Sequence, residues 1–217
     1  MSQIISAIMP LFWMVIVFSI IFTCIRVFKS KIKGKVGEFA VKVQISKYLD
    51  SRYIDLHDLT FNDDQGTTQI DHVLISPFGI FVIETKNYTG WIFGSERQKT
   101  WTQKIYKQAY KFQNPLHQNY RHVKAIEKIL EDVIEPEMIH SFVIFHQGCE
   151  FKTEIPKRVF IGRDWINYVK QFDQQILTET KLKRIQLKLE KEALVRSFQT
   201  DRQHVRNLKN QHSEVSQ

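Results

Sequence analysis

The chain has 217 residues and a mass of 25.8 kDa, enough for one domain of ordinary size with attached segments. Hydrophobic residues make up 43% and charged residues 25% of it, which excludes a disordered chain, and two cysteines exclude a disulfide framework and a cysteine-based zinc site. The net charge of +8 comes from residues 26–35 and 179–217, whereas residues 36–178 are nearly balanced, with 17 basic and 18 acidic residues. The high isoelectric point therefore does not by itself indicate a nucleic-acid partner.

The N-terminal region contains an apolar run. Residues 4–25 carry no charge, and five basic residues with no acid follow in residues 26–35. As a helix the run would be about 33 Å long, enough to cross a hydrocarbon core of ~30 Å. An uncharged start and the lack of a small-residue cleavage site argue against a signal peptide, and a buried core helix is the alternative. We expect a transmembrane anchor at residues 1–26 and a basic juxtamembrane segment at 27–35.

The position of the basic residues predicts an orientation. Positive charges follow the apolar run and none precedes it, which favours an N-terminus outside and the remainder of the chain in the cytoplasm. The expected location is the cell (inner) membrane, with a single pass. Residues 4–25 and the basic residues 26–35 would then contact membrane lipid, the latter through anionic headgroups.

Beyond this segment the pattern predicts helices and strands in alternation. A helix is expected over residues 34–49, followed by strands at 53–61, 69–75, 80–86 and about 90–93. Asn114-Pro115 predicts the start of a helix that runs to about residue 132. Two strands at 138–145 and 158–161, a short helix at 164–172 and a polar helical region from 176 complete the order. This order predicts an α/β or α+β fold with a central sheet, a domain at 36–175 and a basic helical tail at 176–217.

A hairpin places two acids opposite each other. Residues 76–79 read Ser-Pro-Phe-Gly, which suits a type I turn between two strands. If Ser76 faces Gly79, Asp71 faces Glu84, and opposed like charges destabilise a sheet. A divalent cation such as Mg²⁺ or Mn²⁺ would remove the repulsion, and Lys86 on the same side could stabilise a pentavalent phosphate. Because the spacing is loose, a solvated strand end is the alternative.

Several short motifs resemble one known family, the nuclease-related domain (NERD), over roughly residues 33–131. They are Gly37-Glu38, Ile70-Asp71-His72, Gly79, Glu84-Thr85-Lys86-Asn87-Tyr88-Thr89-Gly90, and Pro115 with Gln118. The family is regarded as related to PD-(D/E)xK nucleases, so the resemblance implies an α-β-β-β-α-β core with a mixed sheet flanked by helices. It also implies catalytic roles for Glu38, Asp71, Glu84, Lys86 and Gln118, with the three acids holding the metal. For Gln118 a plain surface glutamine is the alternative.

The resemblance implies an activity. We expect a membrane-anchored nuclease that depends on Mg²⁺ or Mn²⁺ and hydrolyses phosphodiester bonds in DNA, or in RNA as the second choice. The alternative is a module that holds nucleic acid at the membrane without cleaving it.

A basic stretch with interleaved aromatic residues predicts where nucleic acid would lie. It contains Arg97, Trp101, Lys104, Lys107 and Lys111. The three last lysines are spaced to share one face of a helix, and cations with stacking rings are what a nucleic-acid groove needs. A solvated helix face with aromatics packed beneath is the alternative.

The histidines indicate no metal site. His72 should point away from Asp71 and serve in packing or hydrogen bonding, and His117 and His122 should lie on different faces of one helix.

Overall fold

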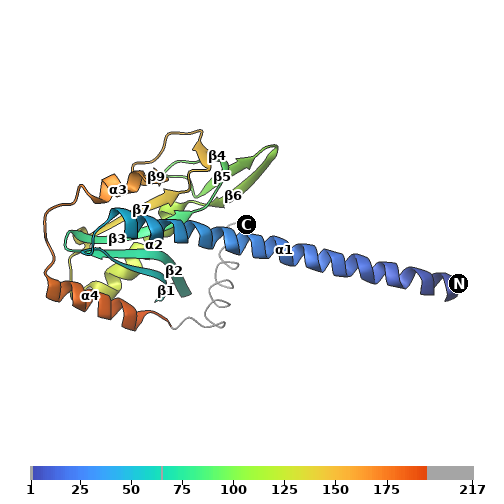
Figure 1. Cartoon of the computed structure of the whole chain (residues 1–217), viewed down its shortest axis with the longest axis horizontal. Helices are drawn as coiled ribbons and strands as arrows, with labels where there is room; N and C mark the ends of the chain where they lie inside the picture. Colours follow the sequence, from blue (N-terminus) through green and yellow to red (C-terminus); the bar gives the residue numbers. More distant parts are fainter. Residues whose placement is uncertain (1, 65, 195–217) are drawn as a thin grey trace.

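The computed structural model describes residues 2–64 and 66–194 (Figure 1). Its first element, α1 (Ser2–Tyr48), is one unbroken helix whose C-terminal part packs on the domain while its N-terminal part projects from it (Figure 1). The apolar run is therefore no separate element, because the same helix continues through the lysine-rich segment into the domain. Within the described residues, none of the helices combines the length and the apolar character that a membrane crossing requires.

The predicted transmembrane anchor at residues 1–26 is thus wrong. The expected lipid contacts of residues 4–25 and 26–35 were inferred from it and lose their basis. The cellular location stays a prediction that no contact in the structure tests.

The central sheet has the strand order β1-β2-β3-β7-β9. Its strands are β1 (Ile54–Asp63), β2 (Gly66–Ser76), β3 (Gly79–Lys86), β7 (Ile139–Phe145) and β9 (Val159–Ile161). The first three strands are antiparallel, and β7 and β9 run parallel to β3, so the sheet is mixed. Ser76 pairs with Gly79, and the predicted register holds as far as the pair His72–Ile83.

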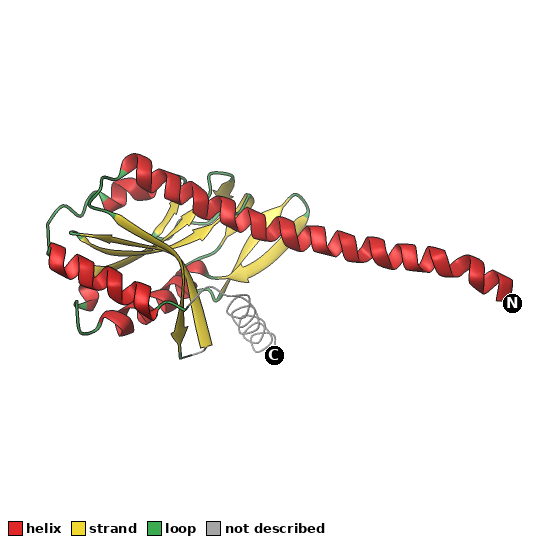
Figure 2. Cartoon of the chain, turned by 60° about the horizontal axis from the view of Figure 1, so that its bottom comes forward, coloured by secondary structure: helices red, strands yellow, loops and turns green. Residues whose placement is uncertain are grey.

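Helices cover both faces of this sheet (Figure 2). On one face, α1 and α3 (Asp164–Val169) bury Val41, Ile45 and Trp165 against β3 and β7. On the other face, α2 (Pro115–Leu130) and α4 (Glu179–Glu192) pack on β2 and β3. The start of α2 is as predicted, because the Asn114 side chain accepts a hydrogen bond from Leu116 N and proline follows at the first helical position.

A second sheet, not predicted from the sequence, has the order β6-β5-β4-β8. It comprises β4 (Gly90–Phe93), β5 (Thr100–Ile105), β6 (Gln108–Gln113) and β8 (Cys149–Phe151). The helix expected around Lys104, Lys107 and Lys111 is wrong: β5 and β6 form an antiparallel hairpin that projects from the domain, with Lys107 in its turn (Figure 1). The expected strand near residue 90 exists as β4, but in this second sheet.

The C-terminal region joins the core as far as it is described. A 3-10 turn, Pro136–Met138, leads into β7, and Leu182, Ile185 and Leu189 of α4 are buried against α2 and the central sheet. The rest of the predicted tail, from residue 195, lies outside the described residues. The predicted domain boundaries stay a prediction.

Candidate active site

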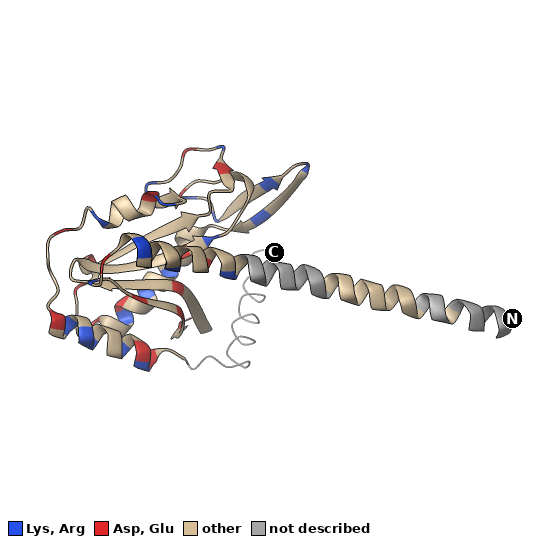
Figure 3. Cartoon of the chain, in the orientation of Figure 1, with Lys and Arg blue, Asp and Glu red and all other residues tan. Residues whose placement is uncertain are grey.

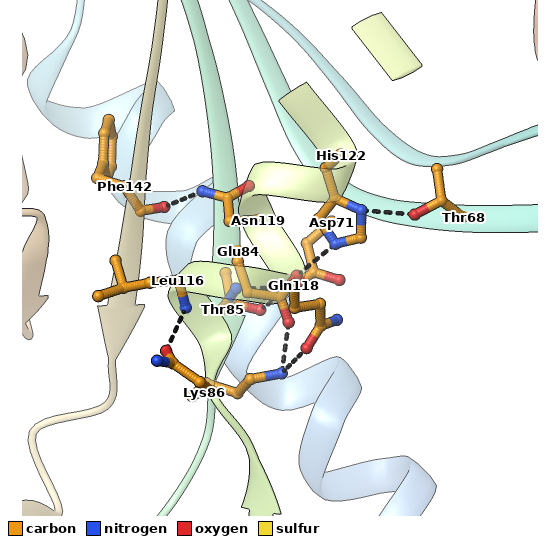
Figure 4. Close-up of polar contacts among 11 residues, drawn as sticks. Thr68, Asp71, Glu84, Thr85, Lys86, Leu116, Gln118, Asn119, His122 and Phe142 are labelled. Carbon is orange, nitrogen blue, oxygen red and sulfur yellow. Dashed lines mark hydrogen bonds and ion pairs between the residues drawn. The ribbon is translucent and has the colours of Figure 1, made fainter. Parts of the chain in front are cut away.

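Asp71 and Glu84 lie at the end of the β2–β3 ladder. They follow directly on the last registered pair, His72–Ile83, on their two strands. Beyond that pair the carboxylate of Asp71 replaces the next ladder bond, because Asp71 Oδ2 accepts from Thr85 N at 2.7 Å and from Thr85 Oγ1 at 2.8 Å. The two strands part here, and the side chain of Glu84, which is 2% exposed, turns toward α2 (Figure 4).

Lys86 joins the two elements that build the site. Its Nζ donates to Glu84 Oε1 and, at 2.9 Å, to Oε1 of Gln118 in the first turn of α2 (Figure 4). Helix α2 is fixed over the strands by Asn119, whose Nδ2 donates to the carbonyls of Val82 and Phe142 at 3.1 and 2.9 Å. The three residues predicted from the E-x-K motif and the helix start are therefore brought into direct contact.

His122 is a member of the site that the sequence analysis did not identify. It is buried, its Nε2 lies 3.0 Å from Glu84 Oε2, and its Nδ1 lies 2.7 Å from Thr68 Oγ1. If Glu84 is ionised, a neutral His122 donates from Nε2 and accepts the Thr68 hydroxyl at Nδ1. The signal was its spacing of four residues from Gln118, which places both on one helix face.

Opposite charges determine how Glu84 and Lys86 ionise. Burial alone would raise the pKa of Glu84, but Lys86 and His122 outweigh it and lower that pKa. Burial would likewise depress the pKa of Lys86, but the nearby charge of Glu84 raises it above its usual value. At neutral pH the site therefore holds a buried ammonium against a carboxylate.

Asp71 is less strongly held in its ionised form than Glu84 is. Burial, followed by the charge of Glu84, raises the pKa of Asp71 to about 6, and the charge of Lys86 and the hydrogen bonds from Thr85 only partly oppose this. A positive charge added near this carboxyl group would stabilise its ionised form and lower its pKa.

Glu38 reaches the same region from α1. Burial, then the charges of Asp71 and Asp58, raise the pKa of Glu38 to about 7, and its side chain hydrogen-bonds to Asp58. Helix α1 can come this close because the residue before Glu38 is glycine. A Cβ on Gly37 would lie 2.9 Å from Asn87 Cβ. In the Gly37-Glu38 motif, the glycine thus lets the backbone of α1 lie close to Asn87, and the next residue supplies an acid near Asp71.

Asp58 is a second residue that the sequence analysis missed. On β1 it falls between the pairs His57–His72 and Leu59–Ile70, at the position opposite Asp71, where the pairing is interrupted. Its φ of 58° is unusual for a residue other than glycine. The alternation of polar and apolar residues in β1 does not predict the interrupted pairing or the positive φ at Asp58.

The acids present fit a hard divalent cation in part. Within the described residues, no three carboxylate, imidazole or thiol groups converge closely enough to form a metal cluster, so the predicted set Glu38, Asp71 and Glu84 is not assembled as one. Asp71, which is partly buried, and Glu84, which is fully buried, nevertheless supply two carboxylates on neighbouring strands whose charges oppose each other. Carboxylate oxygens are the ligands that Mg²⁺ and Mn²⁺ prefer, and such an ion would offset the repulsion between the two negative charges.

The predicted nucleic-acid contacts are only partly accessible. Trp101 is fully buried, stacks on Phe145 and donates from Nε1 to Ser95 O, so its predicted role in stacking on bases is wrong. Lys104 and Lys111 lie on β5 and β6. Arg97 is exposed in the loop that precedes β5, a loop tied to the start of α2 by hydrogen bonds from Asn114.

The fold and the site together define a nuclease-related α/β domain. The family model described as nuclease-related domain (NERD) matches residues 33–146, and the chain belongs to this family. It is also 48% identical over 123 residues to an uncharacterised protein of Bacillus anthracis, an alignment that covers 56% of this chain and 57% of that protein. The chain thus spans little more than half the length of this curated relative. No solved structure matches the chain.

Proposed function

We propose that the domain is a divalent-metal-dependent nuclease that hydrolyses phosphodiester bonds, in DNA rather than RNA. The observation that carries the proposal is the Lys86 ammonium, on a side chain that is only 15% exposed, which donates to Glu84 and Gln118 beside the carboxylate of Asp71. A purely structural ion pair between Lys86 and Glu84 would not need a second carboxyl group, that of Asp71, whose ionisation is disfavoured. The membership of the family supports a nuclease-related function and interaction with nucleic acid.

Each residue has a proposed role. Asp71 and Glu84 would hold the cation, with Glu38 as the acid supplied by α1. When bound, a divalent ion polarises a phosphoryl oxygen and lowers the pKa of water. Lys86 would place its charge against the phosphate where negative charge develops, and Gln118 would fix the direction of its Nζ. His122 would hold Glu84 in its ionised form through its hydrogen bond to Oε2.

The test is cleavage by the purified full chain. Labelled single- and double-stranded DNA and RNA are incubated with Mg²⁺, with Mn²⁺ and with a chelator. We expect cleavage that requires the metal and falls by about 10²–10³-fold in Lys86→Ala, the usual cost of one such electrostatic contact. Lys99→Ala, a substitution at an exposed lysine before β5, is the control and should cleave normally.

Two results would contradict the proposal. One is equal cleavage by Lys86→Ala and the wild type. The other is binding of nucleic acid without cleavage under all metal conditions, which would favour the non-cleaving module.

A further inference from the structure

The second sheet has one face that packs on the domain and one that does not. Ile92, Trp101 and Cys149 are buried in a cluster with Phe145 of the central sheet. Because side chains alternate along a strand, their neighbours point the other way. This outer face carries Trp91, Lys104, Lys111, Glu150 and Lys152.

The register shows how the outer face is arranged. Trp91 of β4 pairs with Lys104 of β5 on one side and with Glu150 of β8 on the other. Lys111 of β6 pairs with Thr102, two residues from Lys104 and on the same face. The outer face therefore has an aromatic ring near its centre and lysines around it. Lysines mark the projecting hairpin in Figure 3.

Trp91 is exposed, and two lysines lie beside its ring. Its side chain is 43% exposed, whereas Trp101 on the inner face is fully buried. Lys152 Nζ lies 4.9 Å and Lys104 Nζ 5.7 Å from the centroid of the Trp91 ring. Lys152 also pairs with Glu150 at 2.5 Å, whereas no acid among residues 2–64 and 66–194 pairs with Lys104 or Lys111. An exposed indole with a net positive surround is complementary to a base joined to phosphates.

A pocket beside the ring provides the space. It has a volume of about 460 Å³ and is lined by residues 89–91 and 104–106. Tyr106, at the turn of the hairpin, is 95% exposed and has a φ of 51°. A second aromatic ring thus stands at the rim of the pocket with its face in solvent.

We propose that the outer face binds single-stranded nucleic acid, with one base stacked on Trp91 and the phosphates contacted by Lys104, Lys111 and Lys152. The bases inside a duplex are already covered by their stacked neighbours, so an exposed ring stacks most readily on an unpaired base, which favours single strands over duplexes. The strand β4 begins four residues after Lys86, so the strand that carries the proposed catalytic lysine leads directly into the sheet that carries the outer face. In this respect the inference rests on the proposed function and names its substrate class.

Binding is measured apart from cleavage. The full chain with Glu84→Gln is titrated into fluorescein-labelled oligo-dT, oligo-U and a DNA duplex in the presence of a chelator, and anisotropy is recorded. We expect Trp91→Ala to weaken binding of the single strands about 5- to 100-fold and Trp91→Phe to weaken it less, since a phenyl ring still stacks. The lysine variant Lys104→Gln with Lys152→Gln should lower the slope of log K against log salt by about 0.7 for each lost phosphate contact.

The chain offers a matched control for Trp91. Tyr48 at the end of α1 is also flanked by two cations, with Lys47 Nζ at 5.5 Å and Arg163 at 5.7 Å from its ring, but it lies outside the second sheet. Tyr48→Ala should bind single strands as Glu84→Gln alone does. Circular dichroism and thermal melts show that each variant is folded.

Indole fluorescence gives a second readout that does not depend on affinity. Stacking of a base on Trp91 should quench part of the emission of the full chain, and Trp91→Phe should abolish that part, because Trp101 and Trp165 are buried and the exposed Trp13 lies in the projecting part of α1, outside the second sheet. Unchanged binding in folded Trp91→Ala together with an unaltered salt slope in the lysine variant would overturn the proposal. So would a loss of duplex binding as large as the loss of single-strand binding.

The outcomes separate this inference from the proposed function. If Glu84→Gln binds oligo-dT through Trp91 but the wild type cleaves nothing, the outer face is supported and the nuclease proposal fails. If the wild type cleaves and Trp91→Ala binds and cleaves equally well, the nuclease proposal stands and the outer face is excluded as the substrate surface.

Discussion

Lys86 Nζ and Gln118 Oε1 are 2.9 Å apart, although 32 residues separate them in the chain. This hydrogen bond joins the end of β3 to the first turn of α2, and it gives the ammonium a second acceptor beside Glu84 (Figure 4). Both elements meet at this point because Asn119 binds the carbonyls of β3 and β7. The orientation of Lys86 therefore depends on the seating of α2.

A substitution of Gln118 should act through Lys86. Gln118→Ala removes the second acceptor of the ammonium, so Lys86 remains charged but is less well oriented. We expect the single-turnover cleavage rate to fall about 10-fold, a smaller loss than Lys86→Ala gives, with little change in the affinity for nucleic acid. Gln118→Glu retains an acceptor and should preserve more of the rate than alanine. A rate loss in Gln118→Ala equal to that of Lys86→Ala would mean that Gln118 contacts the substrate itself.

His122 should contribute to stability as well as to the site. His122→Ala leaves Glu84 Oε2 and the Thr68 hydroxyl without this partner in a buried environment, which should cost about 1–3 kcal/mol of unfolding free energy. Urea denaturation measures the loss. His117→Ala, at an exposed position of the same helix, should stay within about 0.5 kcal/mol of the wild type. Equal stability of the two variants would contradict the role of His122.

Metal binding should depend on Asp71 and on pH. In isothermal titration with Mn²⁺, Asp71→Ala should lose the site, while Asp64→Ala, at an exposed acid, should retain it. Since the pKa of Asp71 is about 6, protons compete with the cation below this value. The affinity of the wild type should therefore weaken as the pH falls from 7 to 5, and binding should release protons. Equal Mn²⁺ binding by Asp71→Ala would show that the ion is held elsewhere.

Removal of the charge of Glu38 should stabilise the fold at high pH. The folded-state pKa of Glu38 is about 7, above its unfolded value of 4.5, so the folded chain holds this proton more tightly and stability falls as the pH rises from about 4.5 to 7. Glu38→Gln should therefore gain stability over the wild type at pH 8 and much less at pH 5. Because Glu38 is half-buried and partly screened by solvent, we expect a gain of about 1–2 kcal/mol.

The melting temperature measures this gain, and a divalent ion tests its cause. If like charges destabilise the site, Mn²⁺ should raise the melting temperature of the wild type more than that of Glu38→Gln. A variant that is less stable than the wild type at pH 8 would contradict the assignment.

The strand register could be predicted because it depends on local geometry. A four-residue turn between β2 and β3 fixes the pairing, and a side-chain period of two then places Asp71 beside Glu84. The contribution of Glu38 could not be derived in this way, because its approach depends on contacts between Gly37 and Asn87, which are distant in sequence. Its identification rested on the family motif.

The hairpin of the second sheet was mispredicted for a physical reason. The spacing of Lys104, Lys107 and Lys111 fits a helix, but the same segment alternates with period two, and Trp101 and Gln103 on its inner face are buried. The buried residues of this segment stabilise the hairpin rather than a helix, because Trp101 packs on Phe112 of the next strand. Lys104 and Lys111 lie on the open side of β5 and β6, and Lys107 lies in the turn between them, so the spacing of the three lysines follows from the hairpin.

The unbroken course of α1 has a mechanical consequence for Glu38. The helix contacts the domain at Gly37, beside Asn87, and again from Val41 onward, so Glu38 lies between two contacts and is about 4.5 Å along the axis from Val41. The far end of the helix is about 58 Å from Val41. If the helix tilts as a rod about Val41, Glu38 moves by only about a tenth of the displacement at the far end. The acid therefore keeps its position beside Asp71 even when the projecting end swings widely, and its geometry is insulated from whatever α1 meets there.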